Sequence, residues 1–167
     1  GKTTAKELTA HVLRAGGKSV LSNIKNYNNG LGHPLTVLRI LSEGNFDVAV
    51  LEMGMSTPDH EIARLCRITP PDVAVELNVL PVHVEHLGSI EGVAKANDPR
   101  VLAMQSLSKG KTITYGIDNP ADVMAKNISF ESFGETKFEL NTASGIAEVN
   151  FPLNGKHNIL NALAAAA

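Results

Sequence analysis

Apolar and polar residues alternate along the chain in a way that predicts helices and strands in turn over its first two thirds. Apolar positions recur at helical spacing over five segments, which are Thr4–Leu13, Pro34–Leu41, Pro58–Ile68, Ser89–Ala96 and Pro99–Ser108. Gly16 and Gly17 follow the first of these and are typical of a helix end. Between the helices lie short apolar runs that read as strands, at Ser19–Leu21, Phe46–Met53, Asp72–Asn78 and Lys111–Tyr115. This alternation predicts a parallel sheet with helices on both faces.

The last third of the chain has a different pattern. Three β-like segments separated by polar turns predict an antiparallel sheet, over Ala125–Phe130, Thr136–Asn141 and Ile146–Phe151. A final helix is expected from about His157 onward. We therefore predict an α/β fold with a mostly parallel sheet flanked by helices and a small appended antiparallel sheet.

Composition narrows the class of protein. The chain has 167 residues, of which 43% are hydrophobic, and a net charge of −2. This length fits one domain, and the near balance of charge predicts no nucleic-acid footprint and no basic membrane patch. No apolar run approaches the length of a membrane span, so no membrane insertion is expected. The single cysteine, Cys66, lies in a helical apolar context and reads as a buried, inert thiol, and a cytoplasmic location is the default.

The first residues resemble half of a phosphate-binding loop. Gly1, Lys2 and Thr3 supply the last three positions of the pattern G-x-x-x-x-G-K-[ST], and a helix follows at once. In such a loop the lysine reaches the β- and γ-phosphates and the hydroxyl lies on Mg²⁺. The tetrapeptide alone would also fit an ordinary polar N-terminus. Read as a phosphate loop, it makes the predicted parallel sheet P-loop-type.

Polar residues end two of the predicted strands. Glu52 closes VAVLE and Asn78 closes DVAVELN. Ligands bind beyond the carboxyl ends of strands in an open parallel sheet, where a carboxylate is well placed to hold Mg²⁺ near phosphates. His83 follows five residues after Asn78 and could ligate a metal or orient a water. The alternatives are a capped strand end for Glu52 and a solvated loop histidine for His83.

Two asparagines begin the last helix. Asn158 and Asn161 are three residues apart on one helical face, and paired amides can read a purine edge. The alternative is that Asn158 simply caps the helix.

Taken in order, the motifs resemble the central ATP-binding domain of the Mur ligases. They are GKTT, NYNNGLGHPLTVLRI, VLEMG, PDVAVELNVLPVHVEHLGSIEGVAKA, NDPRVLAM and GKHNILNALAAAA, and the resemblance covers nearly the whole chain. It implies ATP-dependent amide bond formation in peptidoglycan precursor synthesis, in which a carboxylate becomes an acyl phosphate and an amine attacks it. Within the family, the motifs are most similar to the branch that joins D-alanyl-D-alanine to a UDP-N-acetylmuramoyl tripeptide. The implied cofactors are ATP and Mg²⁺.

The resemblance also implies roles for individual residues. Gly1, Lys2, Thr3 and Thr4 match the phosphate loop, with Thr3 beside Mg²⁺. Glu52 matches the acidic Mg²⁺ ligand and His83 the histidine associated with a second Mg²⁺. The remaining matches are the pair Asn28 and Asn29, facing the substrate and γ-phosphate, and the pair Asn158 and Asn161, near the adenine.

The chain departs from the family pattern after Ala96. The family continues VAKAK-x-E, and its second lysine is carbamylated to supply a metal-binding carboxylate. Here position 97 is asparagine, and a further helix and strand of the pattern are missing near residues 96–97. Lys95 could take the lysine role only out of register. Both ends of residues 1–167 also read as cut from a longer protein, so we expect the chain alone to bind nucleotide weakly and to be inactive.

Two other functions fit the same residues. One is a sister ligase, either another Mur ligase or a folylpolyglutamate synthase, because the selectivity for the amine is expected in a missing domain. The other is a non-catalytic nucleotide-binding domain that has lost its carbamylated lysine.

Overall fold

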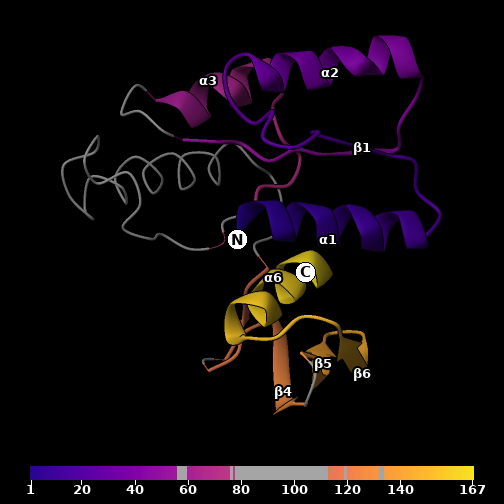
Figure 1. The fold of residues 1–167 in the computed structure, drawn as a ribbon, viewed down its shortest axis with the longest axis vertical. Coiled ribbons are helices and arrows are strands. Elements are labelled where there is room, and N and C mark those ends of the chain that lie inside the picture. The colour runs from indigo at the N-terminus through magenta and orange to yellow at the C-terminus, as the bar shows by residue number, and fades with distance from the viewer. Residues whose placement is uncertain (56–59, 76, 78–112, 119, 132–133) are drawn as a thin grey trace. The chain divides into compact units, whose positions relative to one another are not determined.

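The computed structural model describes residues 1–55, 60–75, 77, 113–118, 120–131 and 134–167. The chain divides into two compact units (Figure 1). One unit combines Gly1–Gly16 with Lys111–Ala167, and the other is Gly17–Gly110. Each is described by itself below.

The first unit begins with helix α1, Lys2–Ala15, which confirms the helix predicted from Thr4. Ala5 and Ala10 lie on its buried face, where small side chains allow close packing. The helix ends at Gly16, and Gly17 has a φ of +85°, a conformation that glycine adopts without strain.

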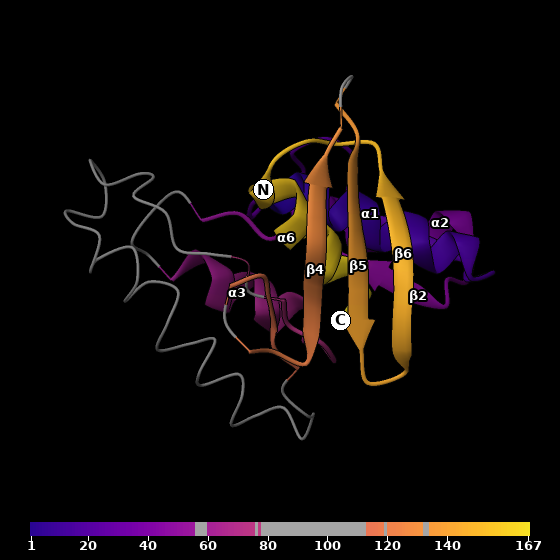
Figure 2. The same ribbon diagram turned by 90° about the horizontal axis from the view of Figure 1, so that it is seen from below.

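The sheet of this unit has four strands in the order β3-β4-β5-β6. Strands β4 (Val123–Phe130), β5 (Thr136–Thr142) and β6 (Gly145–Phe151) pair antiparallel, as predicted (Figure 2). Among the described residues this sheet is the larger of the two. Strand β3 covers only Tyr115–Gly116 and runs parallel to β4, so the strand predicted to reach back through Thr114 is wrong in extent.

Helix α6, Lys156–Ala166, supplies the core of the unit together with the sheet. Its Ile159 and Leu163 are fully buried against strand residues. Phe138 and Phe151 meet edge to face with ring centroids 6.3 Å apart, a favourable aromatic geometry. The cluster comprises Val123, Ala125, Phe138, Phe151, Ile159 and Leu163.

The second unit contains a parallel pair of strands. Strand β1 (Val20–Ser22) pairs with β2 (Val48–Val50), and helix α2 (Gly32–Glu43) connects them. Helix α3 (Glu61–Ile68) follows, and Figure 1 shows α2 and α3 on one side of β1. This βαβ unit and the separate, mostly antiparallel sheet confirm the predicted α/β class.

Two predicted strands differ from the structure in this unit. The apolar run Phe46–Met53 forms a strand only at Val48–Val50, so Glu52 lies two residues beyond it. The run Asp72–Asn78 is not a strand at residues 72–75 and 77, the part that the structure describes. Its β-branched composition favours a strand only where a neighbouring strand accepts the ladder hydrogen bonds, and β1 and β2 pair with each other.

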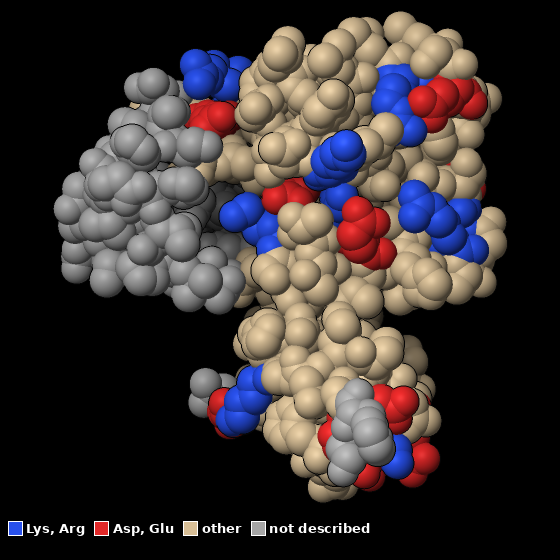
Figure 3. All heavy atoms as spheres, viewed as in Figure 1, with Lys and Arg blue, Asp and Glu red and all other residues tan. Residues whose placement is uncertain are grey.

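Charged side chains are mixed on the surface. On the face shown in Figure 3, Lys and Arg side chains lie among Asp and Glu over the described residues, which agrees with the net charge of −2. Within the described ranges, no helix has both the length and the apolar character needed to cross a membrane.

Candidate functional site

Glu52 lies in the second unit, just past the end of β2, and its backbone is held by Asn23. The Glu52 N–H donates to Asn23 Oδ1 at 2.8 Å, and Asn23 Nδ2 donates back to the Glu52 carbonyl at 2.9 Å. A third bond joins Asn23 Nδ2 to the carbonyl of Tyr27 at 2.8 Å. Asn23 directly follows β1 and is 2% exposed, so the ends of the two strands are tied together by one buried side chain.

The side chain of Glu52 is buried and contacts one of the predicted asparagines. Asn28 Nδ2 donates to Glu52 Oε1 at 3.0 Å. The Gly54 N–H donates to the Asn28 carbonyl at 2.6 Å, and a Cβ at position 54 would lie only 2.9 Å from Asn28 Oδ1. A side chain at position 54 would displace the Asn28 amide, so glycine favours this close approach. The structure thus brings Glu52 and Asn28 together.

Asn29 lies three residues before helix α2 and hydrogen-bonds to its first residues. Its Oδ1 accepts from the N–H groups of Gly32 at 2.9 Å and Leu31 at 3.2 Å, and its carbonyl accepts from His33. These bonds satisfy donors that a helix N-terminus otherwise leaves unpaired. A Cβ on Gly32 would lie 2.5 Å from Tyr27 Cα, so the loop packs tightly against the helix. Asn29 is exposed, and its predicted orientation toward a substrate stays a prediction.

Behind this loop lies a buried histidine. His33 is fully buried, and its Nε2 lies 3.2 Å from Thr69 Oγ1. Its Nδ1 has no hydrogen-bond partner. Burial lowers the pKa of His33, because the charged form loses its hydration.

The predicted phosphate-loop residues lie in the other unit, at the start of α1. Gly1 precedes the helix and its carbonyl accepts from the Ala5 N–H at 3.0 Å. Lys2 and Thr3 are exposed, and the first turn carries no acidic residue. The positive end of the helix dipole and a lysine therefore occupy the same place, which suits an anion.

The two asparagines of α6 hydrogen-bond to each other. Asn161 Nδ2 lies 3.4 Å from Asn158 Oδ1, and Asn158 Nδ2 donates to the Asn154 carbonyl at 2.8 Å. Gly155 precedes the helix and Asn158 lies inside its first turn, so the alternative that Asn158 caps the helix is wrong. Asn161 is buried and Asn158 is half-buried, which leaves Asn158 as the more accessible amide.

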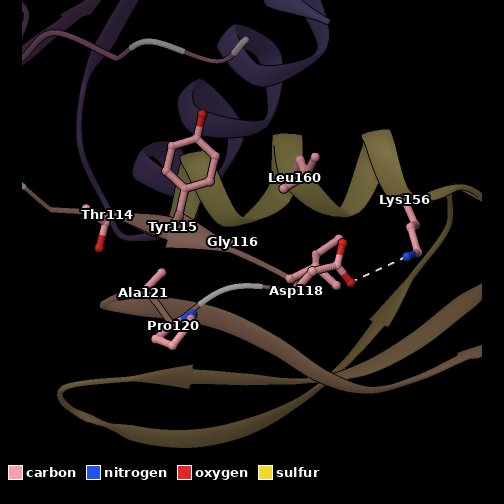
Figure 4. Close-up of a pocket in the computed structure, with 9 residues that line it drawn as sticks. Thr114, Tyr115, Gly116, Asp118, Pro120, Ala121, Lys156 and Leu160 are labelled. Atoms are coloured by element: carbon pink, nitrogen blue, oxygen red, sulfur yellow. Dashed lines mark ion pairs between the residues drawn. The ribbon is translucent and has the colours of Figure 1, made fainter.

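The first unit also contains a cavity of about 300 Å³ (Figure 4). It lies between α6 and the segment around β3, and the ion pair between Lys156 Nζ and Asp118 Oδ1, 3.5 Å long, crosses it. Lys156 and Leu160 line it one helical turn apart, whereas Asn158 and Asn161 fall on the other side of α6. None of the predicted site residues lines this cavity.

Several predictions lie outside the described residues. They concern Asn78, His83, Lys95 and Asn97, together with the helices at 89–96 and 99–108. Within the described ranges, no group of three His, Cys, Asp or Glu side chains could hold a metal. Mg²⁺ commonly binds through one or two carboxylates plus phosphates and waters, so a single buried carboxylate such as Glu52 still fits it.

Four residues of the loop region were missed by sequence reasoning. They are Asn23, Gly32, His33 and Gly54. Only for Asn23 did the sequence carry a signal, namely its place directly after a strand: Asn23 follows β1 as Glu52 closely follows β2. The close approaches at both glycines depend on tertiary packing and have no sequence signature.

Comparison with known proteins places these features in one family. The pattern of the "Mur ligase middle domain" matches residues 1–98 and 94–167. The UDP-N-acetylmuramoyl-tripeptide–D-alanyl-D-alanine ligase of Escherichia coli is 37% identical over 187 residues, covering 100% of this chain and 40% of the relative. The chain thus spans about two fifths of that relative's length.

Solved structures of MurF ligases are similar to this chain in fold, in agreement with the family match. The crystal structure of MurF from Acinetobacter baumannii matches with a TM-score of 0.84 and 28% identity, over 99% of this chain and 39% of that one. MurF ligase from Thermotoga maritima, solved in complex with ADP, matches with a TM-score of 0.79 and 27% identity, over 99% and 42%.

Proposed function

The chain belongs to the Mur ligase family, and from its match to the middle domain of that family we propose that it is the ATP-binding domain of a peptidoglycan-precursor ligase. The ligase would join D-alanyl-D-alanine to a UDP-N-acetylmuramoyl tripeptide. The γ-phosphoryl group of ATP passes to the tripeptide carboxylate, ADP leaves, and the amine of the dipeptide displaces phosphate from the acyl phosphate. The E. coli relative carries the name of this reaction at 37% identity, which supports the choice of branch.

The observation that carries this proposal is the arrangement at the end of β2. Glu52 is a buried carboxylate beyond the carboxyl end of a parallel strand, and its Oε1 accepts from Asn28. Ligands of open parallel sheets bind at this edge. Asn28 belongs to the loop whose family counterpart faces the γ-phosphate.

Each described residue then has a defined task. In the first unit, Lys2, Thr3 and the N–H groups at the start of α1 would meet the phosphates. In the second unit, Glu52 would supply an oxygen ligand for Mg²⁺. When bound, the ion would neutralise charge on the phosphoryl group. Asn28 orients the Glu52 carboxylate through its hydrogen bond, and the half-buried amide of Asn158 would meet the adenine. His83 would serve the second Mg²⁺, as in the family.

The segment near residues 96–97 supports a second candidate function. The alignment with the E. coli ligase runs over 187 residues, 20 more than the chain has, which supports an internal deletion. Asn97 cannot be carbamylated, so the chain as given would bind nucleotide without catalysing amide formation. We therefore propose a central domain that is shortened near residues 96–97 and is inactive by itself. A cytoplasmic location is proposed because ATP is found there.

Calorimetry with Mg²⁺-ATP tests the proposal. We expect weak, Mg²⁺-dependent binding that falls about tenfold in each of two variants, Lys2→Ala and Glu52→Gln, as loss of a charge-assisted contact predicts. Lys137→Ala, on the exposed side of β5, is the matched control and should bind like the parent chain. Binding that ignores the metal and both variants would contradict the assignment. Inserting the corresponding segment of the E. coli ligase after Ala96 should strengthen binding if the deletion removed a ligand.

A further inference from the structure

We propose that Asn23 is the positioning residue of the Glu52 carboxylate, a role that rests on the proposed Mg²⁺ function of Glu52. Asn23 reaches the backbone of Glu52 from the neighbouring strand end and forms three hydrogen bonds, all between 2.8 and 2.9 Å. These three bonds go to backbone groups of Glu52 and Tyr27. The effect of Asn23 on a metal is therefore indirect.

The three bonds determine the orientation of the Asn23 amide. Nδ2 faces two carbonyl oxygens, of Tyr27 and Glu52, while Oδ1 faces the Glu52 N–H. A flipped amide would bring an oxygen against two oxygens, so only one orientation satisfies all partners. Asn23 is only 2% exposed, so water cannot replace these hydrogen bonds at low cost in free energy.

The carboxamide extends the pairing of β1 with β2 beyond the last ladder partners, Ser22 and Val50. A strand end normally loses its fixed direction where its ladder stops. Here both backbone polar groups of Glu52 are bonded, so its Cα–Cβ direction is fixed. The bond from Asn23 to Tyr27 also fixes the loop from which Asn28 Nδ2 reaches Glu52 Oε1. Asn23 thus fixes the position of the Glu52 carboxylate and also that of Asn28, the donor that orients this carboxylate.

Groups that orient metal ligands from behind typically change metal affinity by about 10- to 100-fold when they are removed. We expect Asn23→Ala to reduce the metal-dependent gain in ATP affinity by at least about tenfold, at the low end of that range. This gain is the ATP dissociation constant measured in EDTA divided by the constant measured in Mn²⁺. Mn²⁺ prefers oxygen ligands, as Mg²⁺ does. A variant that merely destabilises the fold would weaken both constants alike and leave the ratio unchanged.

The experiment uses the chain as it stands, with ATP and Mn²⁺ as probes and binding followed by calorimetric titration. Four proteins are compared, namely the parent chain and the variants Asn23→Ala, Glu52→Gln and Asn45→Ala. Asn45 is an exposed asparagine ahead of β2 and serves as the matched control. Hydrogen exchange at the Glu52 N–H, which loses its acceptor in Asn23→Ala, should quicken at least tenfold, while exchange in β4 and β5 stays unchanged. If Asn23→Ala does not fold, Asn23→Thr, which keeps one hydrogen-bonding group, replaces it.

The outcomes separate this inference from the proposed function. A reduced ratio in both Asn23→Ala and Glu52→Gln, with Asn45→Ala unchanged, supports the positioning role. A reduced ratio in Glu52→Gln alone overturns the role of Asn23 and leaves the proposed function intact. An unreduced ratio in Glu52→Gln, or no metal-dependent gain in the parent chain, overturns the metal assignment and the positioning role with it.

Discussion

Replacing the buried histidine by leucine should stabilise the protein. His33 is fully buried, its Nδ1 has no partner, and its Nε2 makes one bond to Thr69. An unpaired buried polar atom costs about 1–3 kcal/mol, and the lost hydrogen bond is worth about 1 kcal/mol. Leucine has a similar volume, and half-buried Thr69 can turn its hydroxyl to water. We therefore expect His33→Leu to raise the free energy of unfolding by about 1 kcal/mol at neutral pH.

The same substitution should change the pH dependence of stability. Burial lowers the pKa of His33 in the folded chain, so between the two pKa values the unfolded state binds more protons. Stability is complete above the ordinary histidine pKa of about 6.5 and falls as the pH drops below it. At a pH one unit below this pKa, the free energy of unfolding falls by at most about 1.4 kcal/mol, because a single proton is involved.

Urea unfolding followed by circular dichroism at pH 5.5 and 7.5 measures both effects. The parent chain should lose more stability at pH 5.5 than His33→Leu does. His11→Gln, at an exposed position of α1, is the control and should keep the parent's pH dependence. An NMR titration of the His33 ring should give an apparent pKa below 6.5. A leucine variant that is less stable at neutral pH, or that keeps the full acid sensitivity, would refute the reasoning.

Three further predictions concern packing and reactivity. Gly32→Ala should destabilise the second unit by about 1–3 kcal/mol in urea unfolding, because its Cβ would lie 2.5 Å from the backbone of the preceding loop. Gly30→Ala is the control and should be nearly neutral, because the space around Gly30 is open. Phe138→Ala should lower the free energy of unfolding by about 3–5 kcal/mol, because it removes a buried ring. Phe130→Ala, at an exposed position of β4, should lower it by less than about 1 kcal/mol. Equal losses in the two variants would contradict the assigned core. Burial raises the pKa of the Cys66 thiol, so iodoacetamide at pH 7.5 should modify it at least about tenfold more slowly than free glutathione until denaturant is added.

The sequence determined the order and type of most elements. Period-3.6 spacing from Thr4 predicted α1, and period-2 segments with polar turns predicted β4, β5 and β6, because these patterns depend on which face of a local element is buried. The order of the motifs also resembled that of the Mur ligases, and the match to their middle domain confirms this resemblance. The proposed role of Glu52 stays a prediction, drawn from an acidic residue that follows an apolar run.

Only the tertiary structure decided how that strand end is built. The run Asp72–Asn78 has the composition of a strand, but pairing is a long-range property and its described residues form none. Asn23 reads as an ordinary loop residue, yet it lies against Glu52, 29 positions away, and holds its backbone on both sides. A Cβ at Gly54 would lie 2.9 Å from Asn28 Oδ1, a contact between residues 26 positions apart. A sequence pattern reports local periodicity, whereas these contacts exist only once β1 and β2 have paired.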